Sequence, residues 1–175
     1  LTHSPFATRP FPLPRNRQTH VETPFLDQLA SMGWLLNTGN PDDPGVTART
    51  SFREVFLEPD LRAALLRLNP GPDGKPWLDE ARLAQAISAL TRFHASNLLE
   101  ANAAVTRLLI DGIDVEGLPH WDGGRSQRIK YIDFDSPDAN TFRAISQFRV
   151  EHPGAQGAHG SGKAIVPDIV LFVNG

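Results

Sequence analysis

A short apolar run near the end of the sequence holds a single charge, and this combination most constrains the fold and the chemistry. Residues 165–173 are β-branched, aliphatic or aromatic apart from Pro167 and Asp168. An apolar run of this length without alternation predicts a strand covered on both faces. Asn174-Gly175 then predicts a tight turn, because both residues accept positive φ. Asp168 is therefore expected at the start of an apolar strand.

Two interpretations of Asp168 compete. In the first, Pro167 opens the strand and the carboxylate meets backbone donors or solvent. In the second, Asp168 is the first acid of a metal-dependent nuclease site. There the next strand carries Glu or Asp, one spacer residue and Lys, and its period of two places both side chains beside the first Asp. Two carboxylates hold Mg²⁺, and the metal and Lys activate water against a phosphodiester.

Several other segments occur in an order that is itself informative. They are residues 22–34 ending in Gly-Trp, Arg53-Glu54-Val55, residues 65–70, Asn102, residues 132–134, Asn140, Gln147-Phe148 and residues 167–175. Together they resemble the N-terminal nuclease domain of the type I restriction enzyme R (motor and restriction) subunit. The resemblance covers residues 19–175. Two positions depart from it: Ser146 stands where Asn is expected, and Val166 stands where a basic residue is expected.

The resemblance implies an α/β fold, with a restriction-endonuclease-like mixed sheet flanked by helices and a helical elaboration. It implies a type I site-specific deoxyribonuclease that hydrolyses DNA phosphodiesters with Mg²⁺, coupled in the whole subunit to ATP-driven DNA translocation. The implied partners are double-stranded DNA and the methyltransferase and specificity subunits. The alternative is a non-catalytic docking or DNA-binding module with a nuclease-like fold. This chain is expected to be inactive alone, because the resemblance places the second catalytic strand after Gly175.

The chain divides into an extended arm, residues 1–18, and one domain, residues 19–175, that includes a helical block over residues 50–111. The first helix has two possible starts, a capping box at Thr19 and the pair Thr23-Pro24. Further on, Asp79 is expected to cap one helix of the block, and Ser96 or Asn97 the next. Residues 113–116 and 127–134 predict a hairpin. The alternation over residues 142–150 predicts one face made of Phe142, Ala144, Phe148 and Val150.

The remaining site candidates are weaker than Asp168. The resemblance makes Glu22 a second metal ligand, although it could simply cap a helix. Arg125, Arg128 and Lys130 form the best basic cluster for phosphate contact, and their alternative is a solvated strand face. Lys163 is a further DNA-binding candidate, and Gln147 a supporting residue.

Composition narrows the functional classes. The net charge of −3 excludes a bulk polycation, so DNA contact needs a local basic patch. The lack of cysteine excludes disulfides, Cys-based zinc sites and a Cys nucleophile. No apolar run reaches the length of a membrane span or a signal peptide, so a cytoplasmic location is expected. Residues 157–163 fit most of a Walker A loop, but Ala164 replaces the hydroxyl that binds Mg²⁺, so this region is not expected to bind ATP.

Overall fold

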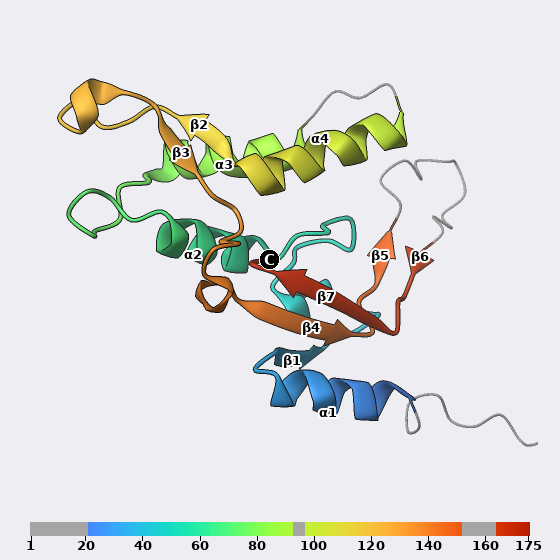
Figure 1. The fold of residues 1–175 in the computed structure, drawn as a ribbon. Helices are drawn as coiled ribbons and strands as arrows, with labels where there is room; N and C mark the ends of the chain where they lie inside the picture. The colour runs from blue at the N-terminus through green and yellow to red at the C-terminus, as the bar shows by residue number, and fades with distance from the viewer. Residues whose placement is uncertain (1–20, 93–96, 152–163) are drawn as a thin grey trace, which may run out of the picture.

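A small mixed sheet lies between one helix on one side and a layer of three helices on the other (Figure 1). The computed structural model describes residues 21–92, 97–151 and 164–175. In these residues the α-helices are α1 (Thr23–Ser31), α2 (Glu58–Leu68), α3 (Glu80–Thr91) and α4 (Leu98–Asp111). The strands are β1 (Leu35–Thr38), β2 (Ile113–Val115), β3 (Gln127–Ile129), β4 (Phe142–Ser146), β5 (Val150–Glu151), β6 (Ala164–Ile165) and β7 (Ile169–Val173). Short 3-10 helices span Pro44–Thr47, Asp122–Gly124 and Pro137–Ala139.

β4 is the central strand of the main sheet. β1 runs parallel to it and places Leu36 opposite Ala144, whereas β7 runs antiparallel and places Leu171 opposite Ala144. The expected mixed sheet is therefore confirmed. β2 and β3 form the predicted antiparallel hairpin, although β3 ends at Ile129, earlier than expected. β5 and β6 form a second antiparallel pair.

Local sequence signals set where three of the helices begin. The Asp79 side chain accepts a hydrogen bond from the N–H of Arg82 at the start of α3. Asn97 accepts one from the N–H of Glu100 at the start of α4. Pro59 stands in the first turn of α2, where its missing N–H has no helical partner to lose. The caps at Asp79 and Asn97 are as predicted.

The larger core lies among α2, α3 and the β2–β3 hairpin. Its buried members are Leu61, Leu65, Trp77, Leu78, Leu83, Ala86, Leu90, Val115, Ile129 and Tyr131. The Tyr131 hydroxyl donates to the carbonyl of Ala86 at 2.7 Å, which satisfies its one polar group. Burial raises the pKa of Tyr131 to about 12. α4 covers this layer with partly buried residues only, among them Leu108 and Leu109.

The sheet has a smaller core on the face turned toward α2. Its buried members are Leu57, Ile145, Phe148 and Phe172. The rings of Phe148 and Phe172 meet edge to face, with centroids 5.0 Å apart. On the other face Leu36, Leu171 and Val173 are exposed. The prediction that the strand at residues 165–173 is covered on both faces is therefore wrong for the described residues, because Phe172 is buried on one face while Leu171 and Val173 remain exposed on the other.

The end of β7 is fastened to both layers by Asn174, which is 1% exposed. Its side-chain NH₂ donates to the carbonyl of Tyr131, and its side-chain oxygen accepts from the N–H of Thr141 and from the guanidinium of Arg67. Asn174 and Gly175 have φ of 61° and 90°. The predicted positive-φ geometry is confirmed.

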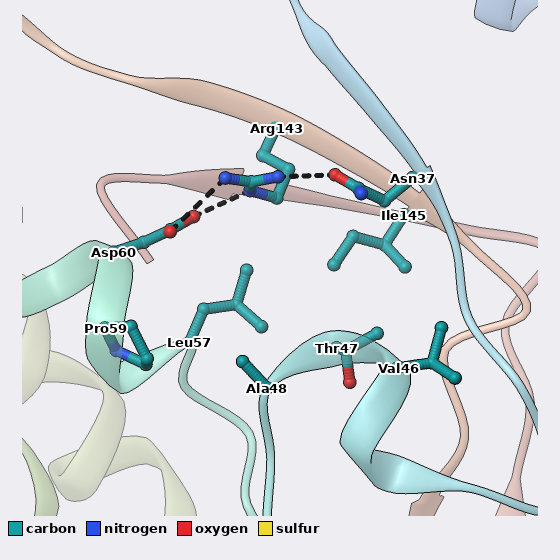
Figure 2. A pocket seen from close by; sticks show the side chains of 9 residues that line it. All are labelled: Asn37, Val46, Thr47, Ala48, Leu57, Pro59, Asp60, Arg143 and Ile145. Atoms are coloured by element: carbon teal, nitrogen blue, oxygen red, sulfur yellow. Dashed lines mark hydrogen bonds and ion pairs between the residues drawn. The ribbon is translucent and has the colours of Figure 1, made fainter.

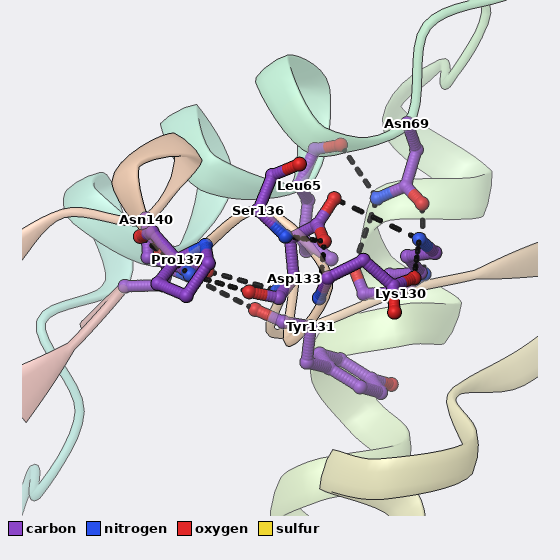
Figure 3. A network of polar contacts seen from close by, with 10 residues as sticks. Leu65, Asn69, Lys130, Tyr131, Asp133, Ser136, Pro137 and Asn140 are labelled. Atoms are coloured by element: carbon purple, nitrogen blue, oxygen red, sulfur yellow. Dashed lines mark hydrogen bonds and ion pairs between the residues drawn. The ribbon is translucent and has the colours of Figure 1, made fainter.

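Asn69, at the C-terminal end of α2, makes a similar junction between α2 and the segment after β3 (Figure 3). The side-chain NH₂ of Asn69 donates to the carbonyls of Leu65 and Lys130, and its oxygen accepts from the N–H of Lys130. The Asn140 side chain binds the backbone of Asp133 twice: its oxygen accepts from the N–H of Asp133, and its NH₂ donates to the carbonyl of Asp133. Because buried polar groups are costly unless they are paired, these satisfied amides fix the segment that joins β3 to β4.

Candidate active site

Asp168 lies at the start of β7, directly after Pro167, and is exposed. Its carbonyl oxygen accepts a hydrogen bond from the N–H of Gln147 at 3.2 Å. Within the described part of the chain, its carboxylate makes no hydrogen bond and no ion pair. The side chain therefore stands at the rim of the sheet as an acceptor open to a ligand, and it is not enclosed in the apolar interior.

The sequence contains the Pro-Asp pair five times, and the structure separates one pair from the others. Asp60 lies in the first turn of α2 and pairs with Arg143. Asp73 lies in a turn and pairs with Lys75. Asp42 lies in a turn, and Asp138 lies in a 3-10 helix. Asp168 differs from these four because it leads into a strand of the main sheet.

Gln147 lies beside Asp168, and Gly39 lies on the other side of Gln147. β4 ends at Ser146, and Gln147 takes a φ of 57°, in the left-handed region that non-glycine residues rarely adopt. The N–H of Gly39 donates to the carbonyl of Ser146 at 2.7 Å, and a Cβ on Gly39 would lie 2.6 Å from the carbonyl oxygen of Gln147. The ends of β1 and β4 and the start of β7 therefore meet here in close backbone contact.

The conformation of Gln147 also corrects one prediction. The alternation over residues 142–150 predicted that Phe148 would share a face with Ala144. Instead, Phe148 packs with Ile145 in the sheet core, and Ala144 is buried as well. The left-handed residue turns the chain at Gln147, so the period of two does not continue past Ser146.

Glu22 precedes α1 and is half-buried. Its own φ and ψ are helical, so the helix does not begin with Thr23 as a cap, and the Glu22 side chain makes no capping bond. Thr19, the other predicted start, lies outside the described residues. Figure 1 shows the N-terminal end of α1 at the same end of the sheet as the start of β7. The described residues contain no group of three or more His, Asp or Glu side chains that could hold a metal ion.

The basic cluster lies elsewhere, on and beside β3. Arg128 makes an ion pair with Asp114 at 2.7 Å, and Lys130 lies 3.7 Å from the carboxylates of both Asp133 and Asp135. Arg125 is exposed. A phosphate would have to compete with these carboxylates for Arg128 and Lys130.

The β2–β3 hairpin and the start of β7 lie at opposite sides of the molecule in Figure 1. The basic cluster and Asp168 are therefore not brought together in one site. Lys163 and the Walker-like residues 157–163 lie outside the described residues.

A cavity of about 130 Å³ opens between α2 and the sheet (Figure 2). At its edge, Nε and Nη2 of Arg143 donate to the two carboxylate oxygens of Asp60 at 2.6 and 3.3 Å. Nη1 of Arg143 donates to the side-chain oxygen of Asn37. This ion pair joins β4 to α2 and occupies both charged groups. The cavity is too small for a nucleotide, so the cluster is best explained as a joint between the two layers.

Sequence reasoning missed a buried cation that packs against Phe148, the residue after Gln147. Arg49 is 4% exposed, and its guanidinium lies 3.6 Å from the centre of the Phe148 ring. Burial lowers the pKa of Arg49, and the charge of Glu54 opposes this shift. No local sequence pattern predicts that Arg49 is buried, because its partners Phe148 and Arg149 lie about 100 residues away in the chain. The only nearby hint is Arg53-Glu54, which the resemblance to the R-subunit family singles out.

A family model described as the type I restriction enzyme R protein N terminus matches residues 16–175. The chain belongs to this family. Curated relatives include the putative type I restriction enzyme MjaIXP endonuclease subunit of Methanocaldococcus jannaschii, 24% identical over 160 residues. Another is the type I restriction enzyme HindI endonuclease subunit of Haemophilus influenzae, 28% identical over 160 residues.

These matches cover 91% and 90% of this chain, respectively, but only 14% of each relative. The R-protein N-terminal domain is therefore a small part of the relatives that it resembles. Its mixed α/β architecture is compatible with a nuclease-like fold. Among the described residues, no helix is both long and apolar enough to cross a membrane.

Proposed function

We propose that this chain is the DNA-cleaving domain of a type I restriction enzyme R subunit, with Asp168 as its first acid. The observation that carries the proposal is the exposed Asp168 carboxylate at the start of β7, in a chain that belongs to the R-protein N-terminal family. The reaction is Mg²⁺-dependent hydrolysis of DNA phosphodiesters. In the whole subunit it is coupled to ATP-driven translocation.

The donor chemistry at Asp168 suits a hard cation. An ionised carboxylate oxygen is the ligand that Mg²⁺ prefers, and Asp168 offers one that no described residue occupies. A bound Mg²⁺ would supply Lewis-acid activation of the phosphodiester and of water. Since the described residues contain no complete ligand set, Asp168 is assigned as one ligand and Glu22 as a second candidate. The proposal expects the remaining Glu and Lys on a strand that follows Gly175.

Gln147 has a supporting role in this proposal through its backbone. Its N–H fixes the carbonyl of Asp168, which limits where the neighbouring carboxylate can point. Fixed orientation matters because a ligand displaced by about 1 Å can cost about 100-fold in rate.

The substrate is double-stranded DNA, and the partners are the methyltransferase and specificity subunits of a restriction-modification complex in the cytoplasm. Arg125, Arg128, Lys130 and Lys163 are the proposed phosphate contacts of this chain. They would add a sequence-independent attraction that weakens with salt. The ATP used by the whole subunit is bound outside this domain.

The test uses a full-length R subunit containing this domain, assembled with its partner subunits. Asp168→Asn removes the charge and keeps the shape. We expect cleavage of DNA to fall about 100-fold or more, since losing a metal ligand removes several kcal/mol of stabilisation. ATPase activity and translocation should remain unchanged.

Asp138→Asn is the matched control, because it changes a second exposed Asp in a Pro-Asp pair that does not enter the main sheet. It should cleave at the original rate. Cleavage at the original rate by the Asp168→Asn protein would contradict the proposal. Loss of cleavage, ATPase activity and translocation together would identify Asp168 as a structural residue and favour the non-catalytic docking module.

A further inference from the structure

We propose that Arg49 is a positioning residue that holds the Asp168 carboxylate in place through the chain around Gln147. This inference rests on the proposed function of Asp168. Arg49 lies in the loop between β1 and α2, and within the described parts of the chain it makes no hydrogen bond or ion pair with Asp168, Arg125, Arg128 or Lys130.

The guanidinium of Arg49 holds two segments that are far apart in the sequence. Its Nη1 donates to the carbonyl of Glu54 at 2.9 Å and to the carbonyl of Arg149 at 3.0 Å. Its Nε donates to the hydroxyl of Thr47 at 2.8 Å. The flat guanidinium also stacks on the Phe148 ring, so both its edge and its face are used.

These contacts fall on the residues that directly follow Gln147. Phe148 and Arg149 are held by Arg49, and the N–H of Glu151 donates to the carbonyl of Phe52 at 2.9 Å. The segment leaving β4 is thus anchored against the loop that carries Arg49. A left-handed conformation such as that of Gln147 persists only where its surroundings determine it on both sides. Gly39 supplies the close contact on one side, and Arg49 the anchor on the other.

Two routes then lead from Arg49 to β7. The shorter one passes through Gln147, whose N–H binds the carbonyl of Asp168. The other passes through the Phe148 ring to Phe172, four residues along the same strand. A purely apolar residue at position 49 could fill the space beside Phe148, but it could not bind the carbonyl of Arg149. The buried charge is therefore explained by directed hydrogen bonds.

The charge of Arg49 is not neutralised by an ion pair within the described residues. A buried charge without such a partner is normally unfavourable, and burial does lower the pKa of Arg49. Three hydrogen-bond acceptors and an aromatic face stabilise the guanidinium, and the charge of Glu54 partly offsets the effect of burial. Arg49 is thus committed to its neighbours and is not available as a phosphate contact.

The experiment uses the assembled full-length R subunit and compares Arg49→Lys, Arg49→Met and Asp168→Asn. Arg49→Lys keeps the positive charge but loses the planar guanidinium that donates to three acceptors at once. We expect its cleavage rate to fall about tenfold and the Mg²⁺ concentration for half-maximal cleavage to rise by a similar factor, as for residues that orient metal ligands. ATPase activity should remain unchanged. Hydrogen exchange at the N–H of Gln147 should accelerate, with or without Mg²⁺.

Asn69→Leu is the matched control, because Asn69 is also buried and also binds backbone carbonyls, but in the helical layer. It should lower the thermal midpoint and leave the Mg²⁺ response and Gln147 exchange unchanged. If the Arg49→Met subunit does not assemble, Thr47→Val tests the same set of Arg49 contacts with a smaller perturbation, because it removes one hydrogen bond of the guanidinium. Removing the acceptor of Nε should move the Mg²⁺ response in the same direction by a smaller factor.

The outcomes separate this inference from the function on which it rests. If Asp168→Asn abolishes cleavage while Arg49→Lys changes only the thermal midpoint, Arg49 is structural and the inference fails alone. If Asp168→Asn cleaves normally, both ideas fail. A rise in the Mg²⁺ requirement together with faster Gln147 exchange in Arg49→Lys supports the positioning role.

Discussion

The helical layer and the main sheet differ in how completely they bury their apolar residues. The helical layer, made of α2, α3 and the β2–β3 hairpin, encloses a continuous core that contains Trp77 and Tyr131. The main sheet buries a small cluster around Phe148 and Phe172 on one face and exposes Leu171 and Val173 on the other. The candidate site lies on the less enclosed of the two.

This difference suggests a division of labour within one domain. Burial of apolar surface is the main source of stability, so the helical layer should dominate the free energy of unfolding. The sheet edge carries Asp168 and the backbone around Gln147. A side chain that binds a ligand must be accessible, so exposure is needed at this position. Asn174 and the Arg143–Asp60 ion pair join the two layers, so that the site rests on the more stable part.

The largest effect is expected from Leu65→Ala in the helical layer. Leu65 is fully buried, so the substitution leaves a cavity and should lower the free energy of unfolding by about 3 kcal/mol or more. Leu98→Ala, at a side chain that is 86% exposed, should change it by less than about 0.5 kcal/mol. Urea titrations of this chain measure both. If Leu65→Ala lowers the free energy of unfolding no more than Leu98→Ala does, the helical layer is not the main source of stability.

A smaller effect on stability and a larger one on activity are expected from Gly39→Ala. The new methyl group would lie 2.6 Å from the carbonyl of Gln147, so the ends of β1 and β4 must move apart. We expect a loss of about 1–3 kcal/mol and a fall in cleavage of up to about 100-fold in the assembled enzyme.

Gly71→Ala provides the comparison for Gly39→Ala. Its methyl group would lie 2.9 Å from the carbonyl of Lys75, a similar backbone collision in a turn of the helical layer. It should cost similar stability without slowing cleavage by the folded enzyme. Equal loss of cleavage in the two variants would show that the site responds to general destabilisation and not to its local geometry.

Features set by local chemistry could be predicted from the sequence. The caps at Asp79 and Asn97, the hairpin of β2 and β3 and the positive φ of Asn174-Gly175 all depend on neighbours a few residues away. The strand after Asp168 and the mixed sheet were also predicted, the sheet through the resemblance to the R-subunit family.

Features set by distant contacts could not be predicted. Gln147 adopts a left-handed conformation that glutamine does not favour, and its neighbours Gly39 and Asp168 are distant from it in the sequence. Arg49 and Arg149 are 100 residues apart, so no local pattern reveals their contact. The exposure of Leu171 and Val173 depends on what packs over that face of β7, which composition alone does not specify.

The most direct measurement is a crystal structure of a full-length R subunit containing this domain, grown with Mn²⁺ in place of Mg²⁺ and recorded at a wavelength where manganese scatters anomalously. The account predicts an anomalous peak about 2.1 Å from a carboxylate oxygen of Asp168, the distance typical of a hard octahedral cation. A peak bound by other residues, with the Asp168 side chain turned to solvent, would contradict it.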